Sequence, residues 1–269
     1  MGSIIAVVSD THFGSTTSIA PPKFEVHTAR PTETAEQTAN RPQADLYEKW
    51  LDYWRYVYLL AGIRGKHRKH RLVLLHIGDV IDGDHHGTRQ ITPEIPDQLA
   101  MAEQVMGEPH NKADIRIGIQ GTEAHAGTNG ENELSFYTAH NYQYIAPRMT
   151  IEIDGLVLDL AHHATAGGRK WTSGAARIAS EVALDYALAG KRLPDYVLRG
   201  HVHQIDDSGW RVRGTRAILC PSWQLRTSFG HRVSTVTLSD IGGVIINCGQ
   251  VDMSKARYEF ASDREVIRI

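Results

Sequence analysis

The stretch LVLLHIGDVIDG, residues 72–83, joins a run of apolar residues directly to a turn that carries Asp79 and Asp82. A short apolar run that ends at a glycine predicts a buried β-strand. Ligands of open α/β sheets bind just outside the carboxyl ends of the strands. This stretch therefore predicts an α/β sheet, and it puts two carboxylates where such a sheet holds its site.

Further apolar runs end in polar residues in the same way. They are IIAVV (4–8) before Asp10 and His12, IRIGIQ (115–120) before GTEAH (121–125), LVLDLA (156–161) before His162 and His163, and YVL (196–198) before RGHVH (199–203). His201 and His203 are two residues apart, so on a strand or tight loop their side chains project to the same side. A single such end is more often a capped turn or a solvated histidine pair. Five of them together predict one shared site where the strand ends meet.

Helical patterns separate these strands. Leu46, Trp50, Trp54 and Val57 have helical spacing and predict a helix over 43–63. The same reasoning predicts helices at 96–106, 131–144 and 173–188, and further strands at 150–153, 217–220, 233–238 and 243–248. The dipeptide Asp154-Gly155 predicts a two-residue hairpin turn. We expect a single α/β domain over residues 1–269, with packed sheets between helices.

The segment from Ser15 to Pro42 is rich in threonine and proline and has no periodicity, which predicts a long loop over 15–42. Because this segment follows Asp10 and His12 directly, we expect the loop to lie over the site. Loops of this length are usually functional or disordered.

The composition is that of a soluble globular protein, with 41% hydrophobic and 22% charged residues. A net charge of −2 argues against a protein that holds nucleic acid by bulk electrostatics, and the basic stretch RGKHRKHR (64–71) is expected to be a solvated connection. Only Cys220 and Cys248 are present, without C-x-x-C spacing, which favours a reducing compartment. The N-terminus has no leader pattern and no apolar run is long enough to cross a membrane, so we expect a cytoplasmic protein without a membrane partner.

The fifteen histidines are the unusual feature of the composition, and several stand beside aspartates at strand ends. Crowding carboxylates and imidazoles together without a cation costs roughly several kcal/mol. Clustered histidines therefore indicate a metal. A mixed set of oxygen and nitrogen ligands suits Mn, Fe or Zn better than Ca or Mg.

The order of these motifs resembles that of the calcineurin-like metallophosphoesterases. The matching elements are D-x-H (10–12), GDVIDG (78–83), GTEAH (121–125), a histidine at His162 and GHVH (200–203), and they span the chain from Asp10 to His203. The segments SDTHFGS, GDVIDGDHHGT, GTEAH and PSWQL are similar in sequence to those of the phage and prophage branch of that family. The resemblance implies a four-layer α/β/β/α sandwich of two mixed sheets flanked by helices, with two divalent metal ions at the strand C-terminal ends. Manganese is the expected metal, with iron or zinc as alternatives. The protein is expected in the cytoplasm of a phage-infected or prophage-carrying bacterium.

The resemblance also implies a ligand set. Asp10, His12 and His203 would hold one metal, Asp79 would bridge, and His162 and His201 would hold the second, with His163 as an alternative to His162. The chain departs from the family at GTEAH, where an asparagine ligand followed by a histidine is expected. Either His125 is the acid histidine, oriented by Asp82 and with Thr122 or Glu123 beside the metal, or His125 is itself the missing ligand.

The activity that the resemblance implies is hydrolysis of phosphodiesters, and also of monoesters, by a hydroxide held between two metals, with His125 as general acid. The alternatives are a metal-dependent DNA or RNA nuclease, a non-catalytic protein-binding scaffold and a closed structural metal site. The expected partner is a phosphate-ester substrate, with nucleic acid only as a substrate. His85, His86 and Arg169 are candidate substrate contacts, and Trp223 and Gln224 either line a pocket or pack in the core.

Overall fold

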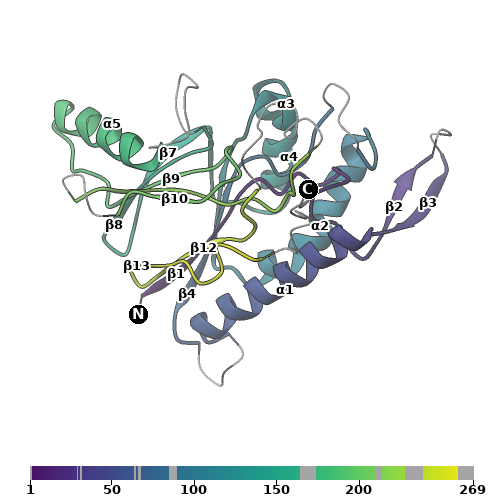
Figure 1. Ribbon diagram of the computed structural model, residues 1–269, viewed down its shortest axis with the longest axis horizontal. Coiled ribbons are helices and arrows are strands. Elements are labelled where there is room, and N and C mark those ends of the chain that lie inside the picture. The colour runs from purple at the N-terminus through teal and green to yellow at the C-terminus, as the bar shows by residue number, and fades with distance from the viewer. Residues whose placement is uncertain are drawn as a thin grey trace, which may run out of the picture.

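Two mixed β-sheets lie face to face between helices in a computed structural model of the chain (Figure 1). The structure describes residues 2–28, 30, 32–63, 65, 68–84, 90–163, 174–209, 214–227 and 239–259. The predicted strand at 233–238 lies outside these residues.

The first sheet has six strands in the order β13-β12-β1-β4-β5-β6. They are β1 (Ser3–Val8), β4 (Arg71–Ile77), β5 (Ile115–Ile119), β6 (Tyr144–Ala146), β12 (Val244–Asn247) and β13 (Gln250–Asp252). Strands β1, β4, β5 and β6 are parallel, and β12 pairs with β1 in the antiparallel sense. The carboxyl ends of β1, β4 and β5 therefore meet at one edge of this sheet.

The second sheet has five strands in the order β10-β11-β9-β8-β7. They are β7 (Arg148–Ile153), β8 (Leu156–Ala161), β9 (Tyr196–Arg199), β10 (Asp206–Asp207) and β11 (Arg216–Leu219). Strands β7 and β8 form the predicted hairpin, in which Asp154 and Gly155 have φ of 51° and 82°, as a two-residue turn requires. Strands β8 and β9 are parallel, so His162 and His201 follow strand ends that lie side by side.

Helices cover the outer face of each sheet. They are α1 (Arg41–Ala61), α2 (Ile95–Lys112), α3 (Glu123–Ala126), α4 (Glu131–Ala139) and α5 (Gly174–Leu188), with a short 3-10 turn at Thr128–Gly130. Figure 1 shows α1 and α2 on one side of the molecule and α5 at the opposite end, beyond the five-stranded sheet.

Alternation along β1 explains the layers. Ile4, Ala6 and Val8 pack among the aromatic side chains of α1, whereas Ile5 and Val7 pack between the two sheets with Leu158 and Leu198. A third apolar cluster joins α5 to the outer face of the five-stranded sheet. Both faces of each sheet are thus buried, which gives the predicted four layers, α/β/β/α, and confirms the fold class.

The boundaries of α1 follow from its capping residues. Asn40 accepts a hydrogen bond from the N–H of Gln43, and the Gln43 side chain accepts one from the N–H of Asn40, which forms a capping box. The helix ends at Gly62, whose φ of 71° suits glycine. On the buried face of α1, Trp50 stacks edge-to-face with Trp223 at a ring separation of 4.9 Å.

Two expectations from the sequence are wrong. The segment 15–42 is not a long loop, because it contains an antiparallel hairpin of β2 (Lys23–His27) and β3 (Thr34–Thr38), whose Phe24 and Val26 are buried. Its strand β2 lies against α2, where His27 Nδ1 is 2.6 Å from an Asp97 carboxylate oxygen. The helix predicted at 131–144 ends at Ala139, because Asn141 has a left-handed backbone and the chain then turns into β6.

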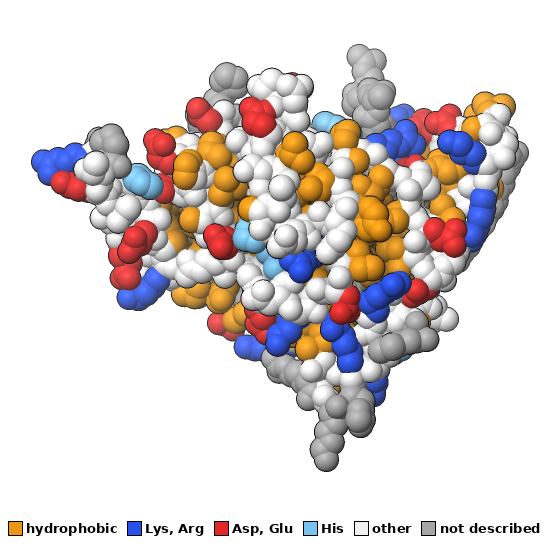
Figure 2. Space-filling model, turned by 180° about the vertical axis from the view of Figure 1, so that it is seen from behind, with side chains coloured by type: hydrophobic (Ala, Val, Ile, Leu, Met, Phe, Trp, Pro, Cys, Tyr) orange, Lys and Arg blue, Asp and Glu red, His pale blue; other side chains and the backbone are white. Residues whose placement is uncertain are grey.

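The surface carries charges of both signs. On the face seen in Figure 2, hydrophobic side chains gather near the middle, and positively and negatively charged side chains are interspersed around them. No helix in the described part of the chain combines the length and apolar character needed to cross a membrane.

Candidate metal centre

The polar strand ends converge as predicted. Residues that follow β1, β4, β8 and β9 form two groups whose candidate ligand atoms lie within 4.8 Å of one another, Asp10 with His12 and His203, and Asp79 with His162 and His201. The six residues come from both sheets, so the site lies where the two sheets end together.

The backbone of this site is strained. Left-handed φ values occur at Asp10 (53°), His12 (44°), Asp79 (55°), His201 (71°) and His203 (55°). In the left-handed region a residue with a side chain costs about 1–2 kcal/mol, because its Cβ crowds the following carbonyl. Such residues persist where the surrounding structure holds them, and they are concentrated at binding and active sites. Their concentration here points to a functional site.

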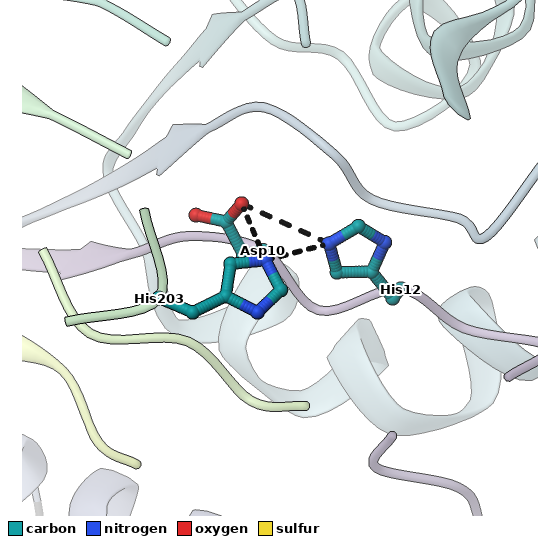
Figure 3. A group of neighbouring side chains, drawn as sticks. All are labelled: Asp10, His12 and His203. Carbon is teal, nitrogen blue, oxygen red and sulfur yellow. Dashed lines mark hydrogen bonds and ion pairs between the residues drawn. The ribbon is translucent and has the colours of Figure 1, made fainter. Parts of the chain in front are cut away.

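The first group is shown in Figure 3, where the carboxylate of Asp10 and the rings of His12 and His203 point toward one another. The Oδ1 atom of Asp10 lies 3.2 Å from His203 Nε2 and 3.7 Å from His12 Nε2. The two imidazole Nε2 atoms are 3.1 Å apart. The other carboxylate oxygen, Oδ2, accepts hydrogen bonds from the hydroxyl of Ser9 and from the N–H of His201 at 3.0 Å. The same N–H reaches Oδ1 at 3.2 Å, and Oδ1 also faces the two rings.

The second group is built around Asp79. Its Oδ2 atom lies 3.0 Å from His162 Nε2, and its Oδ1 atom accepts hydrogen bonds of 2.7 and 3.1 Å from the N–H and hydroxyl of Thr122. His162 donates from Nδ1 to the carbonyl of Ile77 at 2.6 Å, so Nε2 faces the carboxylate. A histidine whose Nδ1–H is held by a carbonyl presents Nε2 in the form that binds metals.

The two groups are adjacent. Asp10 Oδ1 is 3.8 Å from His162 Nε2, and Asp79 Oδ2 is 3.9 Å from His12 Nε2. Each carboxylate is therefore near a histidine of the other group. The arrangement offers two neighbouring sets of oxygen and nitrogen ligands.

Several atoms fit a cation. The Nε2 atom of His162 is buried and makes no hydrogen bond of good geometry, although it lies 3.0 Å from Asp79 Oδ2. Buried polar atoms are almost always paired, so an unpaired imidazole nitrogen aimed at a carboxylate indicates a ligand that binds there. The donors are carboxylate oxygens and imidazole nitrogens, which suits a divalent transition metal.

The pKa shifts express the same crowding. Burial raises the pKa of Asp10, but His162 and His203 lower it more, and the net pKa is well below its usual value. Burial also raises the pKa of Asp79, whereas His162 lowers it strongly, again with a net fall. Burial lowers the pKa of His162, yet Asp79 and Asp10 raise it to about 10. Both carboxylates are thus ionised and need a positive partner, either a proton on His162 or a metal that displaces it.

Asp82 and His125 lie beside the first group. His12, Asp82 and His125 form a third set of candidate ligand atoms within 4.8 Å of one another. His125 Nδ1 donates to the main-chain carbonyl of Asp82 at 2.6 Å, and its Nε2 is 3.9 Å from Asp79 Oδ2. The Asp82 carboxylate lies 3.7 Å from His12 Nδ1. Asp82 thus contacts His125 through its backbone, and its carboxylate faces His12.

The alternatives at GTEAH and at His162 occupy different surroundings. Thr122 is half-buried and donates to Asp79, whereas Glu123 is exposed on α3. His162 is buried, and the exposed His163 lies edge-to-face with it at a ring separation of 5.6 Å. The described groups of candidate ligand atoms include neither Glu123 nor His163.

Of the remaining candidate residues, the structure describes Trp223 and Gln224. His85, His86 and Arg169 lie outside the described residues. Trp223 is fully buried against α1, which favours packing over a pocket wall, and Gln224 is buried with its amide 3.4 Å from an Asp82 carboxylate oxygen.

Glycines allow the strand ends to approach this closely. A Cβ on Gly121 would overlap Asp79 Oδ1, and a Cβ on Gly200 would overlap the hydroxyl of Ser9. Neither glycine was assigned a role from the sequence. A glycine that directly precedes a candidate ligand is the signal that could have identified them.

The chain was also compared with known proteins. No protein-family model matches it, and no curated protein matches its sequence. A structure of a novel archaeal phosphodiesterase matches with a TM-score of 0.42 and 13% identity, over 90% of this chain and 92% of that chain. The phosphoesterase YfcE from E. coli matches with a TM-score of 0.42 and 13% identity, over 90% of this chain and 87% of that chain. Vps29 from Entamoeba histolytica in complex with Zn²⁺ matches with 0.43 and 13%, over 92% of this chain and 88% of that chain. Likenesses this distant leave the interpretation of the site to the side chains of this chain.

Proposed function

We propose that the chain is a binuclear metal-dependent phosphoesterase that hydrolyses phosphodiesters in preference to monoesters. The observation that carries the proposal is the pair of adjacent ligand groups, each with a buried carboxylate and two histidines. A closed structural metal site usually has four ligands, and the two carboxylates and four histidines of these groups exceed that number.

The ligand roles follow the contacts. Asp10, His12 and His203 would hold one ion, and Asp79, His162 and His201 the other, with Asp79 bridging because its Oδ2 is within 4.0 Å of both His162 and His12. Two bound divalent ions would lower the pKa of a water and neutralise charge on the phosphoryl oxygens. Manganese is the proposed metal, with iron or zinc as the alternatives, because all three bind a mixture of oxygen and nitrogen donors.

His125 is the proposed general acid. Its Nδ1–H is held by the Asp82 carbonyl, so the proton available for transfer is carried on Nε2, which faces Asp79. That proton would pass to the ester oxygen as its bond to phosphorus breaks, so that the leaving group departs as a neutral alcohol. Asp82, whose carboxylate faces His12 Nδ1, would hold that ring in position.

The substrate assignment uses the charge of the site. Among the residues that the structure describes, the side chains in contact around the two groups are carboxylates, imidazoles, the hydroxyls of Ser9 and Thr122, and the amides of Gln90 and Gln224. A diester carries one negative charge and needs fewer cationic partners than a doubly charged monoester. His85, His86 and Arg169 stay predicted substrate contacts, and the phage branch and the cytoplasmic location stay predictions from the sequence.

Hydrolysis of bis-p-nitrophenyl phosphate tests the proposal. Protein stripped with a chelator should be inactive and should regain turnover as Mn²⁺ is added. The variant His203→Asn should not, because the shorter side chain loses the Nε2 ligand while asparagine tolerates the left-handed backbone of this position. Absence of turnover with Mn²⁺, Zn²⁺ and Fe²⁺, in a protein that binds them, would favour the scaffold. Turnover of DNA alone, inhibited by salt, would favour the nuclease.

A further inference from the structure

Helix α4 carries two buried polar side chains that contact the backbone at the strand ends of the candidate metal centre. Glu133 and Tyr137 are one helical turn apart, and both are fully buried. Glutamate is rarely buried without a partner. The partners of these side chains lie on the strand ends that carry the predicted ligands.

Glu133 joins two strand ends. One carboxylate oxygen accepts a hydrogen bond of 2.7 Å from the N–H of Val80, and the other accepts one of 2.6 Å from the N–H of Gly121. Val80 directly follows Asp79, and Gly121 directly precedes Thr122, which donates to Asp79. The carboxylate therefore fixes both the backbone that carries Asp79 and the backbone that donates to it.

Tyr137 extends this contact toward β1. Its hydroxyl donates to the carbonyl of Ile119 at 3.1 Å and lies 3.1 Å from Nδ1 of His76, a fully buried histidine in β4. Nε2 of His76 lies 3.2 Å from the hydroxyl of Thr11, and that hydroxyl lies 2.9 Å from the carbonyl of Val80, so its single proton is shared between these two acceptors. Thr11 stands between the candidate ligands Asp10 and His12. One chain of polar contacts therefore runs from α4 to the backbone of both ligand groups.

We propose that Glu133 and Tyr137 are positioning residues that hold Asp79, Asp10 and His12 in their left-handed, metal-binding backbone conformation, an inference that rests on the metal centre proposed above. Neither side chain is assigned a contact with metal or substrate. They act through main-chain N–H and C=O groups and through His76. Hydrogen-bonding partners of this kind, one step behind the ligands, typically change metal affinity by about 10- to 100-fold when mutated.

The competing interpretation is that both residues are ordinary core hydrogen-bonding groups that stabilise the fold without affecting the site. The chain offers a matched control for it. Tyr142 is also a buried tyrosine, and its hydroxyl lies 3.0 Å from Nε2 of the buried His110. Its ring packs on that of Tyr137 at 4.6 Å, a contact that phenylalanine keeps, and its hydroxyl contacts His110 and no predicted ligand. Tyr137→Phe and Tyr142→Phe therefore remove the same hydroxyl from the same kind of pair, one beneath the site and one away from it.

The experiment measures Mn²⁺ affinity by competition with a fluorescent chelator, together with the urea unfolding of the metal-free protein. Glu133→Gln keeps the shape of the side chain but leaves one acceptor oxygen for two N–H donors. It should weaken Mn²⁺ binding by about 10- to 100-fold, with Tyr137→Phe shifting affinity in the same direction by less. Tyr142→Phe should lower stability without changing the dissociation constant. Tyr137→Phe, the milder change, serves if Glu133→Gln does not fold.

The outcomes separate the two proposals. Wild-type affinity in folded Glu133→Gln and Tyr137→Phe, with only their unfolding shifted, would overturn the positioning role and leave the metal centre standing. Equal losses of affinity in Tyr137→Phe and Tyr142→Phe would overturn it too, because the effect would then not depend on the contact with the site. A wild-type protein that binds no Mn²⁺ would overturn both proposals.

Discussion

Replacing Asp79 with asparagine removes one negative charge from the centre of the site and changes the side-chain volume very little. In the native contacts Oδ1 accepts from the N–H and hydroxyl of Thr122, while Oδ2 faces His162 at 3.0 Å. The amide oxygen of asparagine would keep the contacts with Thr122. Its NH₂ group would then occupy the position of Oδ2, where it is a donor and cannot bind a cation.

The expected loss of Mn²⁺ affinity in Asp79→Asn follows from the charge that is removed and its distance from the metal. A unit charge about 4 Å from another is worth about 4 kcal/mol at the effective dielectric constant near 20 that suits protein sites. Removing one partner of a buried charged set typically costs about 3–5 kcal/mol. Taking about 3 kcal/mol as the net effect, Mn²⁺ affinity should fall about 100-fold, since about 1.4 kcal/mol corresponds to a factor of ten.

Isothermal titration of the chelator-stripped protein with Mn²⁺, with elemental analysis after dialysis, measures this change. The control is Asp52→Asn, which removes the same charge from a surface aspartate that pairs with Lys255 and Tyr258. Circular dichroism establishes that both variants fold. Unchanged stoichiometry and affinity in Asp79→Asn would refute the assignment of this carboxylate as a shared ligand.

Three further predictions concern the same site. Metal-free protein should lose stability between pH 7 and 9. The pKa of His162 is about 10 in the folded protein and 6.5 in an unperturbed histidine. The proton on His162 therefore stabilises the fold fully below pH 6.5, and this stabilisation is lost as the pH rises toward 10. The free energy of unfolding in urea should fall by up to about 1.4 kcal/mol per pH unit, and a flat profile in chelator would contradict this. His125→Gln should retain Mn²⁺ but cut kcat about 100-fold or more for an alkyl leaving group while sparing p-nitrophenolate, whereas loss of Mn²⁺ would make His125 a ligand. Gly121→Ala should lose Mn²⁺ because its Cβ would overlap Asp79 Oδ1. The control is Gly107→Ala in α2, where no neighbouring atom lies within 4 Å of the added carbon. It should bind Mn²⁺ with wild-type affinity, and its free energy of unfolding should rise by about 0.5–1 kcal/mol. Equal Mn²⁺ affinity in these two variants would reject the steric argument.

The parts of the fold that could be predicted are those whose burial is strongly patterned. Strands β1, β4 and β8 are almost wholly buried and read as continuous apolar runs, and α1 places its aromatic side chains at helical spacing. The hairpin of β2 and β3 was missed because every residue of β3 is exposed. Only the alternation of Phe24 and Val26 in β2 marked it as a strand.

The candidate site was predictable to the level of its side chains and no further. The carboxyl ends of neighbouring parallel strands meet at one edge, so the proximity of Asp10 to Asp79, and of His162 to His201, followed from topology. The meeting of these two pairs depends on how the two sheets end together, which the residue order does not specify. The contacts of Glu133 could not be foreseen, because a glutamate on a short helix usually faces solvent and its partners here are main-chain N–H groups. The sequence also could not predict that the Asp82 carboxylate faces His12 and that its carbonyl accepts from His125, because these directions depend on the geometry of the turn.

The left-handed backbone of the candidate ligands bears on any attempt to move this site to another protein. At roughly 1–2 kcal/mol each, five such residues cost about as much as the whole net stability of many domains. A recipient scaffold that reproduced only the side-chain positions would relax its loops and scatter the ligands. A successful transplant would have to include the strand ends of both sheets together. Where one of the five left-handed residues is to be substituted, asparagine and glycine are the residues that tolerate that backbone.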